Sequence, residues 1–229
     1  MDIFVSARTF DEYVRMFGLS LDDLDGKILD CAGGAASFTA ELSEQGGAAY
    51  SVDPLYKQPI DGVERAVWSG VGRARDSISS DLCAYDWSYM ENPERHFLMR
   101  STAAKRFLAH RRKTPSCYVP AELPHLPFRD RSFDVVLCSH LLFTYASKID
   151  LRFHITAIGE MLRVCREEVR IYPLVGAELD ASQVLDGVLR HLDGSSIKAR
   201  VEDVRYRFQV GAGEMLRLAS PRATTPPIP

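Results

Sequence analysis

The sequence predicts an α/β fold built on a mostly parallel β-sheet, and three stretches carry this prediction. An apolar run at 27–31 passes through a cluster of Gly and Ala residues into a helix at 38–45. A second strand at 48–52 follows and ends in Asp53. Residues 133–139 are almost continuously apolar, as expected of a strand buried on both faces of a parallel sheet.

The small residues after the first strand predict a ligand site, because they let a ligand approach bare backbone at the start of a helix. Asp53 follows Gly34 by 53 − 34 = 19 residues, about the separation at which a carboxylate on the second strand meets a ribose. A dinucleotide fingerprint would place Ala32, Gly34 and Ser37 at its three glycine positions. Two glycines are missing, so pyrophosphate binding is poorly supported.

Three segments together resemble the class I S-adenosylmethionine-dependent methyltransferases. Residues 30–36 (D-C-A-G-G-A-A) are similar to motif I, D-x-G-x-G-x-G, with Ala at both outer Gly positions. Residues 126–136 (L-P-F-R-D-R-S-F-D-V-V) and 160–164 (E-M-L-R-V) are similar to two later motifs, in the same order. The resemblance covers 27–174. It implies one seven-stranded sheet of order 3-2-1-4-5-7-6, with helices on both faces.

The resemblance also implies S-adenosylmethionine as the cofactor and places its contacts. The motif I loop would lie under the methionine part, Asp53 would accept hydrogen bonds from the ribose, and Glu122 with Leu123 would contact adenine. Residues just after the fourth strand would flank the sulfonium. The expected cofactor-binding residues are Asp30, Cys31, Ala32, Gly33, Gly34, Asp53, Pro54, Glu122, Leu123, Ser139 and His140.

His140 is the expected catalytic residue, with Tyr145 as a weaker candidate. An imidazole of near-neutral pKa can take the proton that an acceptor loses on methylation. The alternative is that His140 only holds the loop, and that the enzyme works by aligning nucleophile, carbon and sulfur. No set of His, Asp and Glu has the spacing of metal ligands, so we expect no metal.

Residues 54–115 form a helical insert after the second strand, where the resembled family usually has one helix. Helices are predicted at 60–80 and 94–113, joined by a loop-like aromatic stretch at 85–90. Its aromatic side chains either wall a pocket or pin the insert to the body. The basic run at 110–113 is either a solvated helix end or a patch for an RNA backbone. The aromatic residues concerned are Tyr85, Trp87 and Tyr89.

The remaining elements follow from local signals. Thr9 and Glu12 form a capping-box pattern in a helix at 6–17, which packs at the sheet edge or acts as a lid carrying Tyr13. Asp150 caps a helix that runs to residue 165. The further expected elements are strands at 116–121, 169–174, 197–208 and 214–218, a helix at 181–192, a hairpin turn at 211–213 and a disordered tail at 221–229.

The composition indicates one globular domain, 1–220, and limits the partners. The chain has 229 residues and a net charge of −3, which gives no electrostatic reason to expect nucleic acid or an anionic membrane. No apolar run reaches the length of a transmembrane helix, and the acidic start does not look like a signal peptide. The five scattered cysteines suggest buried thiols in a reducing cytoplasm.

These observations predict methyl transfer from S-adenosylmethionine to a small-molecule acceptor by in-line displacement. An RNA methyltransferase is one alternative. A non-catalytic S-adenosylmethionine-binding domain is another, since Ala32 and Ala36 weaken motif I and the family's K-P-G-G turn is replaced by 166–168. The failed fingerprint disfavours a nicotinamide oxidoreductase. The sequence indicates neither the acceptor, nor the atom methylated, nor the oligomeric state.

Overall fold

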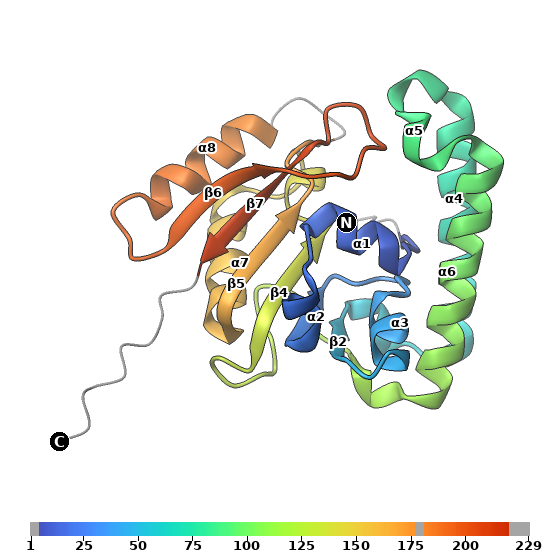
Figure 1. Ribbon diagram of the computed structural model, residues 1–229, viewed down its shortest axis with the longest axis horizontal. Helices are drawn as coiled ribbons and strands as arrows, with labels where there is room; N and C mark the ends of the chain where they lie inside the picture. The colour runs from blue at the N-terminus through green and yellow to red at the C-terminus, as the bar shows by residue number, and fades with distance from the viewer. Residues whose placement is uncertain (1–4, 177–180, 220–229) are drawn as a thin grey trace.

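A seven-stranded sheet of order β3-β2-β1-β4-β5-β7-β6 forms the centre of the protein, as the sequence predicts (Figure 1). The computed structural model describes residues 5–176 and 181–219. The first five strands are parallel, and β7 runs antiparallel to both β5 and β6. The strands are β1 (Lys27–Cys31), β2 (Ala48–Val52), β3 (Tyr118–Val119), β4 (Phe133–Ser139), β5 (Cys165–Tyr172), β6 (Lys198–Asp203) and β7 (Glu214–Ala219).

Helices cover both faces of this sheet, and several begin at the caps expected from the sequence. Thr9 and Glu12 form the predicted capping box of α1, and Asp150 accepts a hydrogen bond from the Phe153 N–H at the start of α7. The helices are α1 (Phe10–Phe17), α2 (Leu21–Asp25), α3 (Phe38–Glu44), α4 (Ile60–Ser80), α5 (Trp87–Met90), α6 (Pro93–Lys113), α7 (Leu151–Val164) and α8 (Ala181–Leu192).

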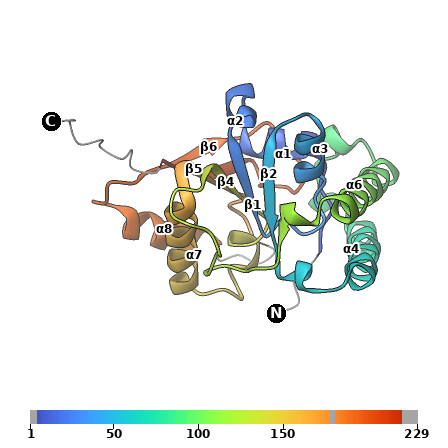
Figure 2. The same ribbon diagram turned by 90° about the horizontal axis from the view of Figure 1, so that it is seen from below.

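The alternation of side chains along each strand divides the core into two layers. Leu29 and Cys31 of β1 pack in the cluster that contains α7 and α8, whereas Ile28 packs in the cluster that contains α1 and α3. Figure 2 shows these helix pairs on opposite sides of the strands. Full burial of each large aliphatic side chain contributes roughly 1.5–3 kcal/mol, so both layers stabilise the sheet.

The segment between β2 and β3 is helical, with α4 and α6 packed side by side (Figure 1). Val63 and Val67 of α4 lie in one buried cluster with Ala104 and Phe107 of α6. The prediction of a loop at 85–90 was wrong in part, because α5 begins within this stretch. The Asp86 carboxylate accepts from the Ser88 N–H and so caps this short helix.

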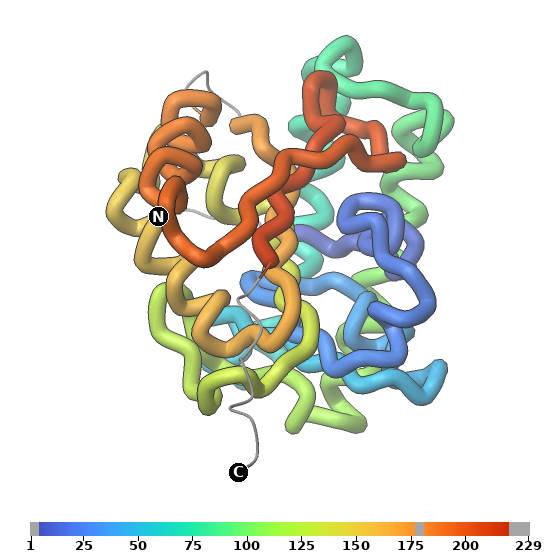
Figure 3. The backbone as a smooth tube through the Cα atoms, turned by 60° about the vertical axis from the view of Figure 1, so that its left-hand side comes forward, coloured from blue at the N-terminus to red at the C-terminus, as the bar shows by residue number. Residues whose placement is uncertain are grey.

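The strand predicted at 197–208 was also wrong in part, because β6 ends at Asp203. Residues 204–213 leave the sheet and pack against the α4–α6 connection, which Figure 3 shows near its top. The Asp86 N–H donates to the Phe208 carbonyl at 2.6 Å, and the Val210 N–H donates to the Ala84 carbonyl at 3.0 Å. The alternating aromatic residues Tyr206 and Phe208 are therefore buried in a loop here, rather than in a longer strand.

Smaller differences concern strand lengths and the thiols. β3 has two residues where 116–121 was predicted, and β5 begins at Cys165, directly after α7. Cys83 is exposed, so the expectation of uniformly buried thiols was wrong. The tail expected at 221–229 lies outside the described residues. No helix within 5–176 or 181–219 is long and apolar enough to span a bilayer.

Candidate functional site

A cavity of about 470 Å³ lies at the carboxyl ends of β1, β2 and β4. Open α/β sheets bind their ligands at this edge. The cavity brings together nine of the eleven residues expected to bind the cofactor, and leaves out Asp30 and Gly33. These nine are Cys31, Ala32, Gly34, Asp53, Pro54, Glu122, Leu123, Ser139 and His140.

The loop after β1 holds an unusual backbone shape with small residues. Ala32 and Gly34 both have positive φ, at 59° and 54°. A Cβ at Gly33 would lie 2.0 Å from Ser51 Oγ and 2.5 Å from Asp30 Oδ2. Only glycine therefore fits at Gly33, behind the surface that faces the cavity. Ala32 adopts the left-handed region at a strain that glycine would avoid.

Asp30 supports this loop from behind rather than lining the cavity. Its side chain is buried, and the Tyr13 hydroxyl donates to its carboxylate at 3.1 Å. Burial holds the pKa of Asp30 well above its usual range, although the Tyr13 hydrogen bond opposes this shift. Tyr13, which the sequence offered as part of a lid, is itself buried in the core and orients Asp30.

Asp53 joins the motif loop to the end of β2. Its Oδ2 accepts from the Gly34 N–H at 3.0 Å, and its Oδ1 accepts from the Leu55 N–H at 2.8 Å. Burial raises the pKa of Asp53, whereas these two hydrogen bonds lower it. The exposed Glu122, which also lines this cavity, forms an ion pair with Lys57 at 3.5 Å. Both carboxylates keep lone pairs for a ligand.

His140 lies where this cavity meets a second one. Its backbone has φ 52°, its N–H donates to the Tyr172 carbonyl at 2.7 Å, and its Nδ1 is 2.8 Å from Ser139 Oγ. Burial lowers the pKa of His140 well below its usual value, and the charges of Arg8 and Arg100 add to this effect. His140 is thus a neutral imidazole near pH 7.

The second cavity, of about 300 Å³, lies between the N-terminal segment, α4 and the loop after β4. Val5, Ser6 and His140 line both cavities. Tyr145 and Tyr85 line only the second. Its other aromatic walls come from elements distant in sequence: Tyr172 of β5, and Tyr206 and Phe208 of the 204–213 loop.

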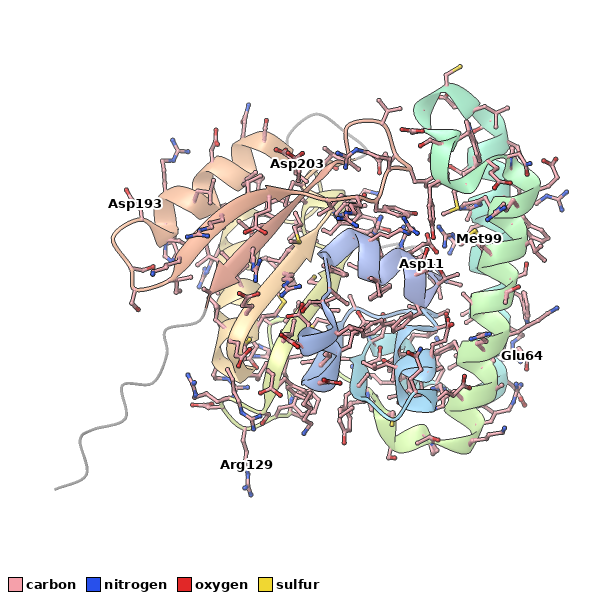
Figure 4. All side chains as sticks on the ribbon, in the orientation of Figure 1. Asp11, Glu64, Met99, Arg129, Asp193 and Asp203 are labelled. Carbon is pink, nitrogen blue, oxygen red and sulfur yellow. The ribbon has the colours of Figure 1, made fainter. Side chains whose placement is uncertain are left out.

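Trp87 and Tyr89 line neither cavity and pin the insert to the body instead. The Trp87 ring packs on Phe208, with centroids 5.6 Å apart. The Tyr89 hydroxyl donates to Asp11 at 2.6 Å. Figure 4 labels Asp11 on α1 and Met99 on α6, where the two helices approach each other. Of the three aromatic residues singled out in the insert, only Tyr85 thus faces a cavity.

The helix predicted at 6–17 was wrong at its start, because α1 begins at Phe10, and no motif marks residues 5–8 as part of a site. The Ala35 N–H donates to the Ser6 carbonyl at 3.0 Å, and the Ser37 N–H donates to the Arg8 carbonyl at 2.9 Å. The segment therefore runs along the motif loop and places Arg8 in the second cavity. This segment, rather than α1, occupies the place of the expected lid.

The two cavities differ in charge. The first is lined by the carboxylates Asp53 and Glu122 and, among the described residues, by no Lys or Arg. The second is lined by Arg8, Arg100 and Lys148 and, in the same part of the chain, by no Asp or Glu. No group of three or more His, Cys, Asp or Glu in the described ranges could hold a metal ion. The first cavity thus suits a cationic ligand, and the second an anionic one.

A family model spans two of the three segments that carry the resemblance, 126–136 and 160–164. A model of the "Methyltransferase domain" family matches residues 96–172. An uncharacterized protein of Methanocaldococcus jannaschii is 29% identical over 216 residues, which cover 94% of this chain and 95% of that protein. Among solved structures, a SAM-dependent methyltransferase from Aquifex aeolicus is 14% identical with a TM-score of 0.45, and the match covers 92% of this chain and 89% of that one. A putative S-adenosyl-L-methionine-dependent methyltransferase from Methanococcus maripaludis is 11% identical, covering 93% and 83%, with a TM-score of 0.47.

Proposed function

We propose that the chain, whose sheet has the strand order implied by its resemblance to the class I S-adenosylmethionine-dependent methyltransferases, binds S-adenosylmethionine and transfers its methyl group to a small-molecule acceptor. The observation that carries the proposal is the pair of adjoining cavities that meet at His140. The first would hold the cofactor and the second the acceptor. Their sizes lie within or near the range of roughly 300–1,000 Å³ of small-molecule sites.

The first cavity fits the cofactor chemically. Asp53 stands beside the motif loop, where a carboxylate can accept from both ribose hydroxyls, and Glu122 with Leu123 lies at the end expected for adenine. Leu126, Leu141 and other apolar side chains in the lining would flank a planar base. Among the described residues this lining contains the carboxylates Asp53 and Glu122 and no Lys or Arg, which disfavours a pyrophosphate.

The residues around His140 would act mainly by positioning. When bound, S-adenosylmethionine supplies a methyl group made electrophilic by a positive sulfur. The chain holds the nucleophile in line with it and excludes water. Because the pKa of His140 is lowered, its neutral imidazole is a weak general base. We therefore assign His140 to alignment of the acceptor, together with Tyr145, which lines the same cavity.

The test is calorimetric titration with S-adenosylmethionine, S-adenosylhomocysteine and NAD. We expect S-adenosylmethionine and S-adenosylhomocysteine to bind, and we expect no binding of NAD. Asp53→Ala should weaken binding by about 1.5–3 kcal/mol, typical of a hydrogen bond to a charged group, or roughly 10- to 150-fold. Asp53→Asn, which keeps one acceptor oxygen near the Gly34 N–H, separates loss of charge from loss of the loop contact.

Asp193→Ala serves as the matched control, because Asp193 is exposed and lies far from both cavities (Figure 4). Its cofactor affinity should equal that of the wild type. Unchanged affinity in Asp53→Ala would remove Asp53 from the site. Binding of the cofactor without turnover on any acceptor would support the non-catalytic alternative. RNA binding that weakens steeply with salt would support the RNA methyltransferase alternative instead.

A further inference from the structure

The side chains that line the second cavity indicate the chemical class of the acceptor, an inference that rests on the proposed function. Three cationic side chains line this cavity: Arg8, Arg100 and Lys148. In a low-dielectric cavity each cation matters according to whether a carboxylate already neutralises it. The partners of these three residues therefore decide what the cavity can recognise.

Arg100 is already neutralised. Its Nη1 and Nη2 atoms both lie 2.5 Å from the buried Glu12 carboxylate, which also accepts from the Tyr206 hydroxyl at 2.7 Å. Its Nε donates to His96 Nε2 at 3.0 Å. A bidentate pair of this kind satisfies the guanidinium and leaves little attraction for a ligand. Arg100 is therefore part of the wall.

Arg8 is not neutralised in this way. Its Nη1 is 3.9 Å from Glu12 Oε1, too far for a hydrogen bond, and only 12% of its side chain is exposed. Within the described residues its Nε is buried without a hydrogen-bond partner. After burial, the Arg8 charge is the largest cause of the lowered pKa of His140. The Arg8 guanidinium is thus a buried donor that faces the cavity shared with His140.

Two further groups complete a polar end. Thr144 Oγ1 is buried and, in the part of the chain that the structure describes, has no hydrogen-bond partner. Lys148 is exposed at the cavity mouth, with its Nζ 6.0 Å from the centre of the Tyr145 ring. Both residues follow β4 on the same loop as His140. A buried donor left unpaired is costly, which favours a ligand that would accept from it.

Much of the remaining wall of the cavity is apolar. Its wall includes Val71 and Ile78 of α4, and the buried rings of Tyr172, Tyr206 and Phe208. Such a wall suits a flat apolar body, since aromatic rings stack on one another.

We propose that the acceptor is a small organic acid with an apolar or aromatic body, whose anionic group is bound by Arg8, Thr144 and Lys148. A carboxylate and a phosphate monoester share the chemistry that these donors recognise. The apolar body would lie against Tyr172, Tyr206 and Phe208, beside His140.

The test compares acids with neutral analogues of the same shape. Each compound is titrated by calorimetry into protein saturated with S-adenosylhomocysteine. The carboxylates are phenylacetate, 3-phenylpropionate and indole-3-acetate, each compared with its carboxamide. The phosphate is phenyl phosphate, compared with phenol. We expect at least one acid to bind tenfold or more tightly than its neutral partner. Arg8→Gln and Lys148→Met should each reduce this preference, and the double variant should abolish it.

The controls are Lys105→Met and Arg205→Gln, whose side chains are exposed away from the cavity. Both should keep the full preference. The affinity for S-adenosylhomocysteine is measured first in the wild type and in every variant. If the wild type does not bind it, the proposed function is wrong. Normal cofactor affinity with no preference for any acid, or a preference that survives in the double variant, would overturn the present proposal alone. Lys148→Met, being at an exposed position, remains informative if Arg8→Gln folds poorly.

Discussion

At the scale of single residues, the site depends on side chains and backbone held in costly states. Ala32 and His140 occupy the left-handed region without being glycine. His96 is buried and accepts from Arg100 through Nε2. Burial, with repulsion from Arg100, lowers its pKa from 6.5 to about 3. Such states persist only where the surrounding structure imposes them, and they cluster at functional sites.

Ala32→Gly should stabilise the protein. The left-handed backbone costs Ala roughly 1–2 kcal/mol, and the extra freedom of Gly in the unfolded chain offsets roughly 0.4–1 kcal/mol of that gain. We expect a net increase of about 0.5–1 kcal/mol in the free energy of unfolding, measured with urea, and unchanged affinity for S-adenosylhomocysteine. A loss of stability would show that Ala32 is not strained.

His96 should make stability depend on pH below neutrality. The unfolded chain binds a proton near pH 6.5 and the folded chain only near pH 3, so stability is complete above 6.5 and is lost as the pH falls towards 3. At 1.36 kcal/mol per unit, this amounts to about 2 kcal/mol between pH 7 and pH 5. The free energy of unfolding is measured with urea at both pH values. Between pH 7 and pH 5 it should fall by about 2 kcal/mol less in His96→Gln than in the wild type. Equal slopes would contradict the lowered pKa.

At the scale of elements, one buried carboxylate ties three segments together. Glu12 on α1 accepts from Arg100 on α6 and from Tyr206 in the 204–213 loop. Arg100 in turn donates to the Ala7 carbonyl at 3.0 Å. The aromatic wall of the second cavity therefore depends on a polar network made by residues far apart in the sequence.

Glu12→Ala should destabilise the fold by about 3–5 kcal/mol, because it leaves the Arg100 charge buried and unpaired. Arg95→Ala on α6, the helix that carries Arg100, is the control. Its ion pair with Glu91 is half exposed, and its loss should cost less than about 1 kcal/mol. Chemical denaturation measures both. A similar loss of unfolding free energy in the two variants would mean that the hydrogen bonds of Glu12 do not hold these segments together.

At the scale of the whole molecule, both cavities open near the carboxyl edge of one sheet, and residues 5–8 separate them. The walls of the cofactor cavity come from β1, β2, β4 and the N-terminal segment. These parts converge only in the folded chain, so the unfolded chain has no equivalent site. A ligand bound in the first cavity would consequently stabilise the folded chain.

S-adenosylhomocysteine should therefore stabilise the folded chain. At 100 times its dissociation constant, the free energy of unfolding should rise by about 2.7 kcal/mol, measured by urea titration with and without the ligand. Asp53→Ala should show a smaller rise at the same ligand concentration, about 0.3–1.4 kcal/mol for binding that is roughly 10- to 150-fold weaker. An unchanged unfolding midpoint in the wild type would argue against a cofactor site in the first cavity.

The sequence by itself determined the strands β1, β2 and β4 and the long helices, whereas the resemblance to a known family implied the sheet order and most of the residues that line the first cavity. The strands and helices follow from local signals, namely apolar periodicity and caps such as Thr9 and Asp150, which need only neighbouring residues. Only the tertiary structure decided that Asp30 lies behind the motif loop, and that Arg8 joins His140 at a second cavity. Residues 5–8 and 204–213 carry no motif, and their side chains acquire a function only through burial beside residues distant in the chain.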